Sequence, residues 1–442
     1  MKDKQKSARL NACSRRGFLK RGAAATACAV GFPYIVPASA LGADGRTAPS
    51  NRIVLGFIGV GKQGRESHLA SLRHHDDVQI VAVSDVESGR LAQCKQIVEE
   101  SYANKADRAS FKGCEAYGDF RDLLAREDID AVVVATPDHW HATVCILAAK
   151  AGKDIYCEKP LTRTIAEGRA LVDAVERYGR VFQTGSQQRS EYGGRFRRAA
   201  ELVRCGAIGE LRSIDIGIGG PPETGYHLPA EPVPDTLDWD FWLGPAPWRP
   251  YNSELCPLNF SGYPHWRYYR DYAGGSFSDF GAHHFDIAQW AMDMDDSGPV
   301  DVIPADGKEH DRLTFVYANG IPMYHGAEAD CVFHGTKGKI LVSRGFLHAE
   351  PESILDTPLG ADDVHLGRGR GHREDWLHCI RTRERPIADA EIGHRTSTIC
   401  QLGNIAFILN RRLKWNPEIE RFENDEEANR LLSRPARSPW RL

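Results

Sequence analysis

Short apolar runs alternate with longer stretches of helical periodicity through the first half of the chain. The run Ile53–Ile58 predicts a buried strand, and further strands are expected at 78–84, 131–135, 154–157 and 181–184. Helices are expected between them, at 65–74, 141–151 and 165–178. Strands that alternate with helices indicate βαβ units, so this half is predicted to form a doubly wound parallel sheet of the α/β class.

The pattern changes after about residue 190. A helix (195–205) and a strand (211–217) precede a Pro-, Trp- and Tyr-rich stretch at 219–272 that has no regular period. The later strands are expected at 311–317, 321–324, 329–333 and 339–342, and a helix at 393–410 is expected to pack back on the structure. This half is predicted to be an α/β domain with a mostly antiparallel open sheet, and the charged tail 424–442 a surface extension.

The N-terminus has the three parts of a secretory signal. Residues 14–20 read Ser-Arg-Arg-Gly-Phe-Leu-Lys, a weakly apolar stretch follows at 22–36, and Ala38-Ser39-Ala40 offers a small-residue cleavage site. The paired arginines indicate the twin-arginine route. We therefore expect residues 1–40 to be a signal peptide, read by the twin-arginine export machinery, and the mature protein to be periplasmic. An uncleaved anchor is the alternative, although the apolar stretch is short for a membrane span.

Net charge and cysteine content argue against nucleic-acid binding, a disulfide framework and a zinc site. The 442 residues carry a formal net charge of -4, but residues 1–40 alone carry eight Lys/Arg and one acid, so the remainder is acidic. Nucleic-acid binding is not expected of an acidic protein, since phosphate contacts need clustered cations. The eleven cysteines show no CxxC spacing, which argues against a disulfide framework or a zinc site.

A glycine motif follows the first predicted strand directly. Gly59, Gly61 and Gly64 lie between a strand and a helix, and Asp85 ends the next strand 21 residues later. Such glycines permit a tight turn, close approach of a pyrophosphate and close packing of helix on strand. The helix N-terminus would bind the phosphates, and Asp85 the ribose hydroxyls. Its charge would repel a 2′-phosphate, so NAD is favoured over NADP. A glycine turn without a ligand is the alternative.

Three further motifs resemble those of the Gfo/Idh/MocA oxidoreductases, which include glucose–fructose oxidoreductase and inositol dehydrogenase. They are Glu158-Lys159-Pro160 at a strand end, Thr136-Pro137-Asp138-His139-Trp140-His141, and Gly274-Gly275-Ser276-Phe277-Ser278-Asp279-Phe280-Gly281-Ala282-His283. The resemblance covers about residues 52–415. It implies a Rossmann domain, placed at 52–186, and a substrate domain, placed at 187–415, with the nicotinamide between them. The polar, Gly- and Pro-containing stretch 41–51 is expected to be a linker, and 416–442 a C-terminal extension.

The resemblance also implies roles for individual residues. His283 would accept the proton of the substrate hydroxyl, Asp279 would orient that imidazole or bind a hydroxyl, and Lys159 would hold the reacting oxygen. The residues expected to contact the cofactor are Gly59, Gly61, Lys62, Gln63, Gly64, Asp85, Thr136, Pro137, His141 and, at the nicotinamide ribose, Glu158. These assignments suit hydride transfer, which needs a base and a cation beside the carbinol.

Helical spacing gives a second view of the Asp279 segment. Asp279, His283, Asp286 and Trp290 would share one face, while Phe280, His284, Ile287 and Ala291 would form a stripe facing the core. Substrate contacts are expected from Gln187, Arg189, His265, Trp266 and Arg267, because sugars offer apolar faces to rings and hydroxyls to Arg and His. Loop packing or an oligomer interface would equally explain these aromatics. His139 and His141 could pair on a metal, but no metal is expected.

These features predict an NAD-dependent oxidoreductase that acts on a secondary hydroxyl of a sugar, glycoside or inositol. Since NAD is not supplied outside the cytoplasm, we expect the cofactor to be tightly held and recycled. Three alternatives stay open: an NAD-dependent glycoside hydrolase or lyase, a non-catalytic carbohydrate-binding protein, and a metal-dependent sugar isomerase. An open sheet makes a homo-oligomer, a dimer or a tetramer, the expected assembly.

Overall fold

The computed structural model describes residues 51–103, 113–259 and 262–441. The predicted signal at 1–40 and most of the linker lie outside these ranges. Among the described helices, none combines the length and the apolar character that crossing a membrane requires.

The N-terminal sheet has six parallel strands in the order β3-β2-β1-β4-β5-β6. This order reverses direction beside β1 and confirms the predicted doubly wound sheet. Apart from the exposed edge strand β3, the strands are mostly apolar and buried. Their bounds are β1 Ile53–Ile58, β2 Val78–Ser84, β3 Glu115–Tyr117, β4 Ala131–Val134, β5 Asp154–Cys157 and β6 Phe182–Thr184.

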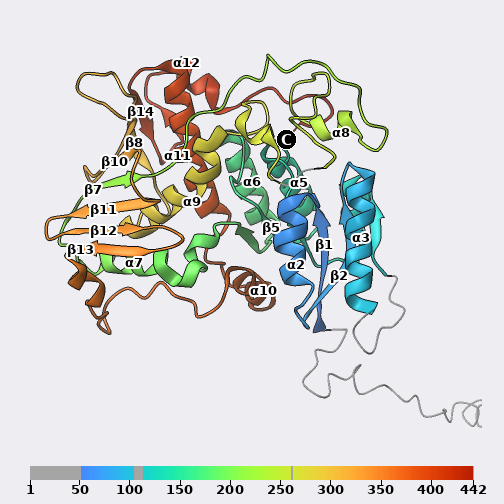
Figure 1. The fold of residues 1–442 in the computed structure, drawn as a ribbon, viewed down its shortest axis with the longest axis horizontal. Helices are drawn as coiled ribbons and strands as arrows, with labels where there is room; N and C mark the ends of the chain where they lie inside the picture. The colour runs from blue at the N-terminus through green and yellow to red at the C-terminus, as the bar shows by residue number, and fades with distance from the viewer. Residues whose placement is uncertain (1–50, 104–112, 260–261, 442) are drawn as a thin grey trace, which may run out of the picture. The chain divides into compact units, whose positions relative to one another are not determined.

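Helices cover both faces of this sheet (Figure 1). The glycine turn leads into a π-type helix at Gln63–Leu69, which α2 (Ala70–Leu72) continues. The others are α3 Ser88–Ala103, α4 Phe120–Leu124, α5 Asp138–Lys150 and α6 Ile165–Arg177. Helix α6 begins with a capping box, in which Thr164 and Glu167 satisfy each other's backbone N–H groups.

The second sheet has nine strands in the order β13-β12-β11-β7-β10-β9-β8-β14-β15. All its neighbours pair antiparallel except β7 and β10, which run parallel, so the predicted mostly antiparallel sheet is confirmed. The bounds are β7 Leu211–Ile216, β8 Pro299–Ile303, β9 Thr314–Tyr317, β10 Pro322–His325, β11 Cys331–Gly335, β12 Lys339–Val342, β13 Leu347–Glu350, β14 Leu413–Asn416 and β15 Arg421–Phe422.

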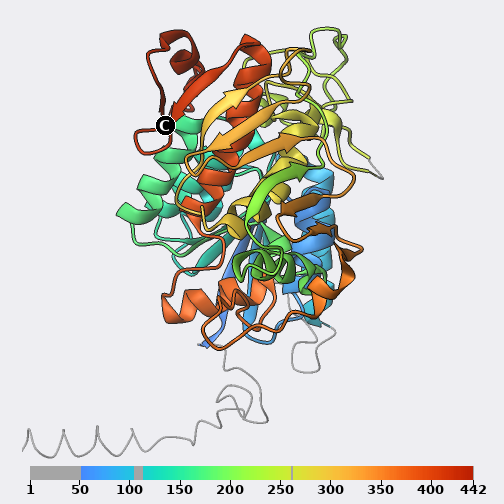
Figure 2. The same ribbon diagram turned by 90° about the vertical axis from the view of Figure 1, so that its left-hand side faces the viewer.

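Helices α7 (Arg195–Arg204), α9 (Gly275–Met292) and α11 (Ala390–Leu409) cover one face of the second sheet. Helix α11 also packs against α6, and so joins the two sheets; Figures 1 and 2 show α9 and α11 between them. Helix α10 (His372–Thr382) instead contributes Trp376 and Leu377 to the core beside β1 and β2. Further helical segments are α12 Glu426–Asn429 and short 3-10 turns at Gln187–Arg189, Tyr192–Gly194, His265–Tyr268, Glu352–Asp356 and Arg430–Leu432.

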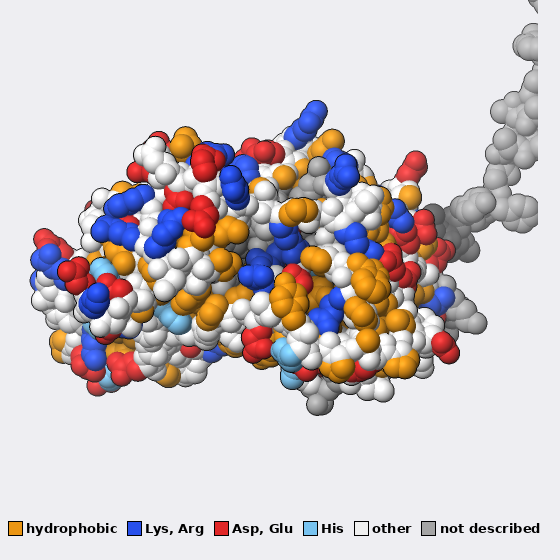
Figure 3. All heavy atoms as spheres, turned by 90° about the horizontal axis from the view of Figure 1, so that it is seen from above, with side chains coloured by type: hydrophobic (Ala, Val, Ile, Leu, Met, Phe, Trp, Pro, Cys, Tyr) orange, Lys and Arg blue, Asp and Glu red, His pale blue; other side chains and the backbone are white. Residues whose placement is uncertain are grey.

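The stretch 219–272, which we call the aromatic segment, forms a cluster of its own. It contains α8 (Trp239–Leu243), and its buried side chains include Trp239, Trp242 and Tyr272. Loop packing therefore accounts for many of its aromatic residues, one of the two explanations left open above. Others are exposed, among them Tyr226 and Trp248, and hydrophobic side chains crowd the right-hand half of the face seen in Figure 3.

Two local predictions are wrong. The tail 424–442 is not a simple surface extension, because Trp440 is buried against Trp140 and Phe120 of the N-terminal half and Phe241 of the aromatic segment. Nor does Phe280 face the core, since 45% of it is exposed. Both errors follow from reading local polarity alone: partners distant in sequence decide which side of an element is covered.

Candidate functional site

The glycine turn has the geometry that a phosphate cradle requires. Gly59 has a φ of +83°, and a Cβ there would lie 2.7 Å from the backbone of Thr136. A Cβ on Gly64 would lie 2.2 Å from the carbonyl oxygen of Gly59, so the helix can approach the turn only without a side chain. Gly61 has open space at the same position. A dinucleotide fits this turn, because Gly59 and Gly61 line a cavity and Gly61 leaves room for a phosphate at the start of the helix.

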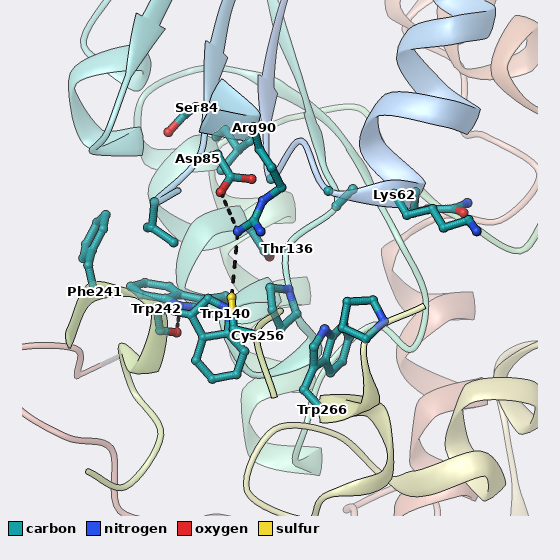
Figure 4. Close-up of a pocket in the computed structure, with 18 of the residues that line it drawn as sticks. Lys62, Ser84, Asp85, Arg90, Thr136, Trp140, Phe241, Trp242, Cys256 and Trp266 are labelled. Atoms are coloured by element: carbon teal, nitrogen blue, oxygen red, sulfur yellow. Dashed lines mark hydrogen bonds and ion pairs between the residues drawn. The ribbon is translucent and has the colours of Figure 1, made fainter. Parts of the chain in front are cut away.

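The turn opens into a cavity of about 840 Å³, the glycine-turn cavity, part of which is drawn in Figure 4. Of the residues predicted to contact a cofactor, Gly59, Gly61, Lys62, Gln63, Asp85, Thr136 and Pro137 line it. Gly64 lies behind the turn. An aromatic wall of Phe120, Trp140, Phe241, Trp242 and Trp266 faces them, and supplies the apolar surface that a nucleotide base needs.

Asp85 lies at the end of β2 and is already partly engaged. Its Oδ2 accepts a hydrogen bond from Val60 N at 3.0 Å, and its Oδ1 accepts from Glu87 N at 3.0 Å and from Arg90 Nη2 at 3.2 Å. The carboxylate keeps lone-pair capacity for a ribose hydroxyl. Arg90, which also lines the cavity, offsets its charge (Figure 4). The argument that Asp85 alone repels a 2′-phosphate is therefore weaker than the sequence indicates.

The aromatic segment covers this cavity. Ser88 N donates to Thr236 O at 2.9 Å, and Asp238 N donates to Val86 O at 3.0 Å. Further along, Tyr263 donates its hydroxyl proton to Gln63 Oε1 at 2.9 Å. The segment is thus bonded to the start of α3 and the loop before it, and through Tyr263 to the helix after the glycine turn. A ligand in the cavity would be enclosed.

A second space, which we call the interdomain cavity, has a volume of about 1530 Å³ and is lined from both sheets. Its walls come from the ends of β4 and β5 and from α9, the turn after β12 and the start of α10. The lining residues include Gln63, Thr136, Asp138, His141, Glu158, Lys159, Gln187, Glu191, Tyr192, Tyr263, Trp266, Arg267, Asp279, Phe280, His283, Arg344 and Arg373. Gln63, Thr136 and Trp266 line both cavities, so the two are adjacent.

The three predicted catalytic side chains meet in the interdomain cavity. Lys159 follows β5, and its Nζ donates to Asp279 Oδ1 at 2.5 Å and to the Asp279 carbonyl at 2.8 Å. This ion pair joins the two domains. Burial acts to raise the pKa of Asp279, but the charges of Lys159 and Arg267 hold it below its usual value. Asp279 therefore pairs with the ammonium; no hydrogen bond from it to the imidazole of His283 is found, contrary to one of the two expected roles.

His283 lies one helical turn beyond Asp279 and lines the same cavity. The ring is buried, and neither of its nitrogens has a hydrogen-bond partner among the described residues; Nδ1 is wholly inaccessible. Burial, with the charges of Lys159 and Arg344, holds the pKa of His283 well below its ordinary value. The imidazole is therefore neutral near pH 7 and able to accept a proton. Its neighbour His284 is also buried and lies against the Gly217 carbonyl oxygen.

Glu158 is fixed by a network rather than free for a ribose. Its Oε1 lies 2.7 Å from His68 Nε2 and accepts hydrogen bonds from Gln63 Nε2 at 3.0 Å and Gln187 Nε2 at 2.8 Å. His68 Nδ1 accepts from Arg373 Nε, so its Nε2 carries the proton given to Glu158. Although burial acts to raise the pKa of Glu158, these bonds and the Lys159 charge hold it well below the usual range.

The histidines of the Thr-Pro segment do not form a metal pair. His141 Nδ1 lies 2.9 Å from Pro160 O and Nε2 lies 2.9 Å from Thr136 O, which ties this segment to the turn after β5. His139 Nε2 lies 3.1 Å from Trp242 O. Within the described ranges, no three His, Cys, Asp or Glu side chains gather where they could hold a metal ion. The nine cysteines of those ranges are all free thiols.

The predicted substrate residues separate into two groups. Gln187, Trp266 and Arg267 line the interdomain cavity. Arg189 does not: it is 1% exposed and forms paired hydrogen bonds with Asp286 and Asp295 inside the second domain. His265 is exposed and lies 3.5 Å from Glu254, outside both cavities. Assigning Arg189 and His265 to the substrate is therefore wrong, because neighbours in sequence point to different sides of a 3-10 turn.

Some residues that line the interdomain cavity were not predicted from the sequence to be functional. The carboxyl of Asp138 makes no hydrogen bond to any described residue, and burial, with the nearby Asp279 charge, raises its pKa to about 8. Asp138 lies inside the Thr136–His141 motif, between residues predicted to contact the cofactor, so its place in that motif could have indicated a role in the site. Arg344 and Tyr192 lie in turns far apart in the chain, and no sequence pattern marks them.

Comparison with known proteins agrees with this architecture. The family model described as the oxidoreductase family NAD-binding Rossmann fold matches residues 53–186, and its C-terminal alpha/beta domain matches 223–442. A glycosyl hydrolase family 109 protein of Shewanella baltica is 31% identical over 208 residues, which are 45% of this chain and 44% of the relative. The match thus spans less than half of that relative.

Solved structures share the fold at low identity. An NAD-binding protein from Listeria innocua aligns with a TM-score of 0.56 and 19% identity, over 82% of this chain and 97% of that one. The aldose-aldose oxidoreductase from Caulobacter crescentus, complexed with glycerol, gives 0.56 and 18%, over 82% and 99%. The glycine turn on a doubly wound sheet, the open second sheet and the match of both domain models agree: the chain belongs to the Gfo/Idh/MocA family of oxidoreductases.

Proposed function

We propose that this protein oxidises a secondary hydroxyl of a sugar, glycoside or inositol and retains its NAD between turnovers. One observation carries the proposal: a paired ammonium, Lys159, and an unpartnered neutral imidazole, His283, line one cavity beside the glycine turn. A carbinol oxygen within reach of both could bind Lys159 as it gives its proton to His283. NAD, when bound, supplies the hydride acceptor.

Each residue of the site has its own role in the proposed reaction. Lys159 binds the reacting oxygen and stabilises the charge that develops there, while Asp279 holds its ammonium in position. His283 takes the hydroxyl proton at a ring nitrogen. Glu158, held by three neighbours, fixes Gln63 and Gln187 at the junction of the two cavities. The cover of the aromatic segment excludes water and supports slow release of the cofactor.

The experiment begins with protein purified without added cofactor. We expect mass spectrometry of the denatured sample to release NAD, with NADP as the alternative that Arg90 leaves open. Addition of a substrate sugar should then raise the absorbance at 340 nm within one turnover. Lys159→Gln and His283→Ala should retain the nucleotide and give this signal about 100-fold more slowly or not at all. Sugar binding with neither reduction of the nucleotide nor cleavage of the sugar would indicate a non-catalytic carbohydrate-binding protein instead.

Redox-assisted cleavage of a glycoside is a second candidate, favoured by the relatives called glycosyl hydrolase family 109. Transient oxidation acidifies the neighbouring C–H, and elimination then needs an acid to protonate the departing oxygen. Asp138 suits that need, because it lines the cavity and its raised pKa, about 8, keeps it protonated at neutral pH. Release of p-nitrophenol from nitrophenyl glycosides, with solvent deuterium entering the sugar and no net NADH, would identify this reaction.

We further propose that the protein works after export by the twin-arginine route, in the periplasm, as a dimer or tetramer. The Arg15-Arg16 pair and the cleavage site support the route, which carries folded proteins and so allows a cofactor to be loaded first. Replacing both arginines by lysine should leave the protein in the cytoplasmic fraction. Light scattering of the exported form measures its assembly.

A further inference from the structure

Arg344 is a cation of the interdomain cavity without a paired carboxylate in the part of the chain that the structure describes. Arg344 follows β12 and lines the cavity that holds Lys159 and His283. No carboxylate of the described residues lies within 4.0 Å of its guanidinium, and its Nε is buried without a hydrogen-bond partner. An unpaired charge in a partly closed space is costly unless a ligand completes it.

The guanidinium is held in place from two sides. Its Cζ lies 4.9 Å from the ring centre of Tyr192 and 5.9 Å from that of Phe280. Phe280 follows Asp279 directly, so this platform adjoins the Lys159 ion pair. Arg195 donates from Nη1 to the carbonyl oxygens of both Tyr192 and Arg344, at 2.7 and 3.3 Å, and so joins the two turns.

The backbone at Tyr192 is strained. Its φ is +57°, in the left-handed region that a ringed side chain rarely adopts, and two glycines with positive φ follow. Strain of this kind costs free energy and is found where a side chain must be held in one place. Here it presents the ring that Arg344 stacks on. The platform is therefore built into the fold and is not the resting place of a mobile surface arginine.

The interdomain cavity as a whole is lined by more cations than ionised carboxylates. Lys159, Arg267, Arg344 and Arg373 line it, and against them stand Asp138, Glu158, Glu191 and Asp279. Lys159 and Asp279 pair, and Asp138 is protonated at neutral pH, so the cations exceed the ionised carboxylates. Arg373 is bonded to His68 and Ser67, whereas Arg267 stacks on Tyr263 and Trp266. Of these four cations, only Arg344 has a buried N–H group, at Nε, without a hydrogen-bond acceptor in the described ranges. Its stacking partner Phe280 is the residue next to Asp279 of the Lys159 ion pair.

We propose that the sugar this site takes carries an anionic group, a carboxylate or a sulfate, and that Arg344 binds it. The inference rests on the proposed function and specifies its substrate class as acidic sugars. A planar guanidinium matches the paired oxygens of such a group. The rings of Tyr192 and Phe280 lie where they could contact the apolar face of the same sugar.

The experiment compares matched neutral and acidic sugars on the purified holoprotein. The pairs are methyl glucoside with methyl glucuronide, methyl galactoside with methyl galacturonide, and N-acetylglucosamine with its 6-sulfate. Calorimetry gives each Kd, and absorbance at 340 nm gives reduction of the bound nucleotide. Arg344→Gln removes the charge and Arg344→Lys keeps it without the planar donor pair. Arg212→Gln, at an exposed ion pair on β7, is the matched control.

In at least one pair, we expect the acidic sugar to bind about 10-fold or more tightly than its neutral partner. Arg344→Gln should reduce that preference to about twofold, Arg344→Lys should give an intermediate value, and Arg212→Gln should change nothing. Preference for a carboxylate or for the sulfate identifies which group is bound. Neutral preference in every pair, no binding of any acidic sugar, or a preference that survives Arg344→Gln would overturn the inference.

The same experiment distinguishes failure of the proposed oxidoreductase function from failure of the Arg344 assignment. Protein that releases no NAD or NADP on denaturation would contradict the oxidoreductase proposal whatever it binds. Protein that holds the nucleotide and is reduced by neutral sugars alone would contradict only the assignment of Arg344.

Discussion

Replacing Arg189 by Met separates a structural role from a role in substrate binding. The side chain is 1% exposed, and its guanidinium donates from Nε and Nη2 to both oxygens of Asp286, at 2.9 and 2.8 Å. It also bonds Asp295 at 2.8 and 2.7 Å and lies 5.0 Å from the ring centre of Trp290. Methionine fills similar volume but leaves Asp286, which is wholly buried, without its cation.

Removal of one partner from a buried ion pair costs about 3–5 kcal/mol, because the remaining charge cannot be hydrated. Asp286 keeps a hydrogen bond from Thr396 at 3.2 Å, which limits the loss. Asp295 is 22% exposed and can be hydrated, so it adds little. We therefore expect Arg189→Met to lower the free energy of unfolding by about 3–5 kcal/mol, with KM for the sugar unchanged.

Denaturant unfolding and steady-state kinetics measure the two quantities. The matched control is Arg212→Met, whose partner Glu210 is also exposed, and which should cost less than about 1 kcal/mol. Adding Asp286→Leu to Arg189→Met should recover part of the loss, since no buried charge is then unpaired. An Arg189→Met protein of unchanged stability and raised KM would refute the reasoning and return Arg189 to the substrate site.

Three more outcomes follow from the site. Gly64→Ala should yield protein without nucleotide by mass spectrometry, because its Cβ would meet the Gly59 carbonyl oxygen at 2.2 Å. Lys159→Gln should reduce kcat/KM by about 100-fold and move the acid limb of its pH profile to higher pH. The sign follows because burial and the Lys159 charge both lower the pKa of His283, and the variant loses one of them. Asp138→Asn should be more stable than the unmodified protein at pH 9 and equal to it at pH 4, by denaturant unfolding. The pKa of Asp138 is raised by burial to about 8, so its stabilising effect is complete at low pH and is lost as pH rises through that value.

Each of these has an outcome that contradicts it. Gly220→Ala, where a Cβ meets nothing within 4 Å, should retain the nucleotide; equal retention in Gly64→Ala would show that the turn is not the cradle. An acid limb that stays in place in Lys159→Gln would mean that another group is the base. A stability difference for Asp138→Asn that grows toward low pH would show that the buried carboxyl is ionised.

The centre of the parallel sheet was predictable because β1 and β4 are continuous apolar runs, followed by the glycine turn and by Thr136-Pro137. Strands β3, β8, β13, β14 and β15 were missed, because they are short or carry polar residues. The match between the Ile53–Ile58 run and the observed β1 reflects burial on both faces, which leaves no other arrangement for such a run. Helix α10 was missed, because only contact with the distant core around β1 determines that Trp376 is buried. The same limit explains Trp440.

The site was predictable where chemistry and local geometry coincide. Glycines with close backbone neighbours, and Lys159 at a strand end, are such positions. Gln187 and Arg189 are polar residues of the same short segment, so the sequence predicts the same role for both. In the structure Gln187 donates to Glu158, whereas Arg189 donates to the buried carboxylate of Asp286. Arg344 depends on a stacking partner about 150 residues away. Such pairings are properties of the assembled fold, and no local pattern records them.

The cover over the glycine turn has a consequence for the order in which the molecule is made. The strands and turn that face the nucleotide precede residue 190, whereas the aromatic segment and Trp440 come later in the chain. Domains fold as they emerge during synthesis. The strands and the glycine turn can thus begin to form before the aromatic segment that covers them is made, although α10 completes their core only later. Capture during translation, followed by closure, would make the nucleotide a component of the folded protein.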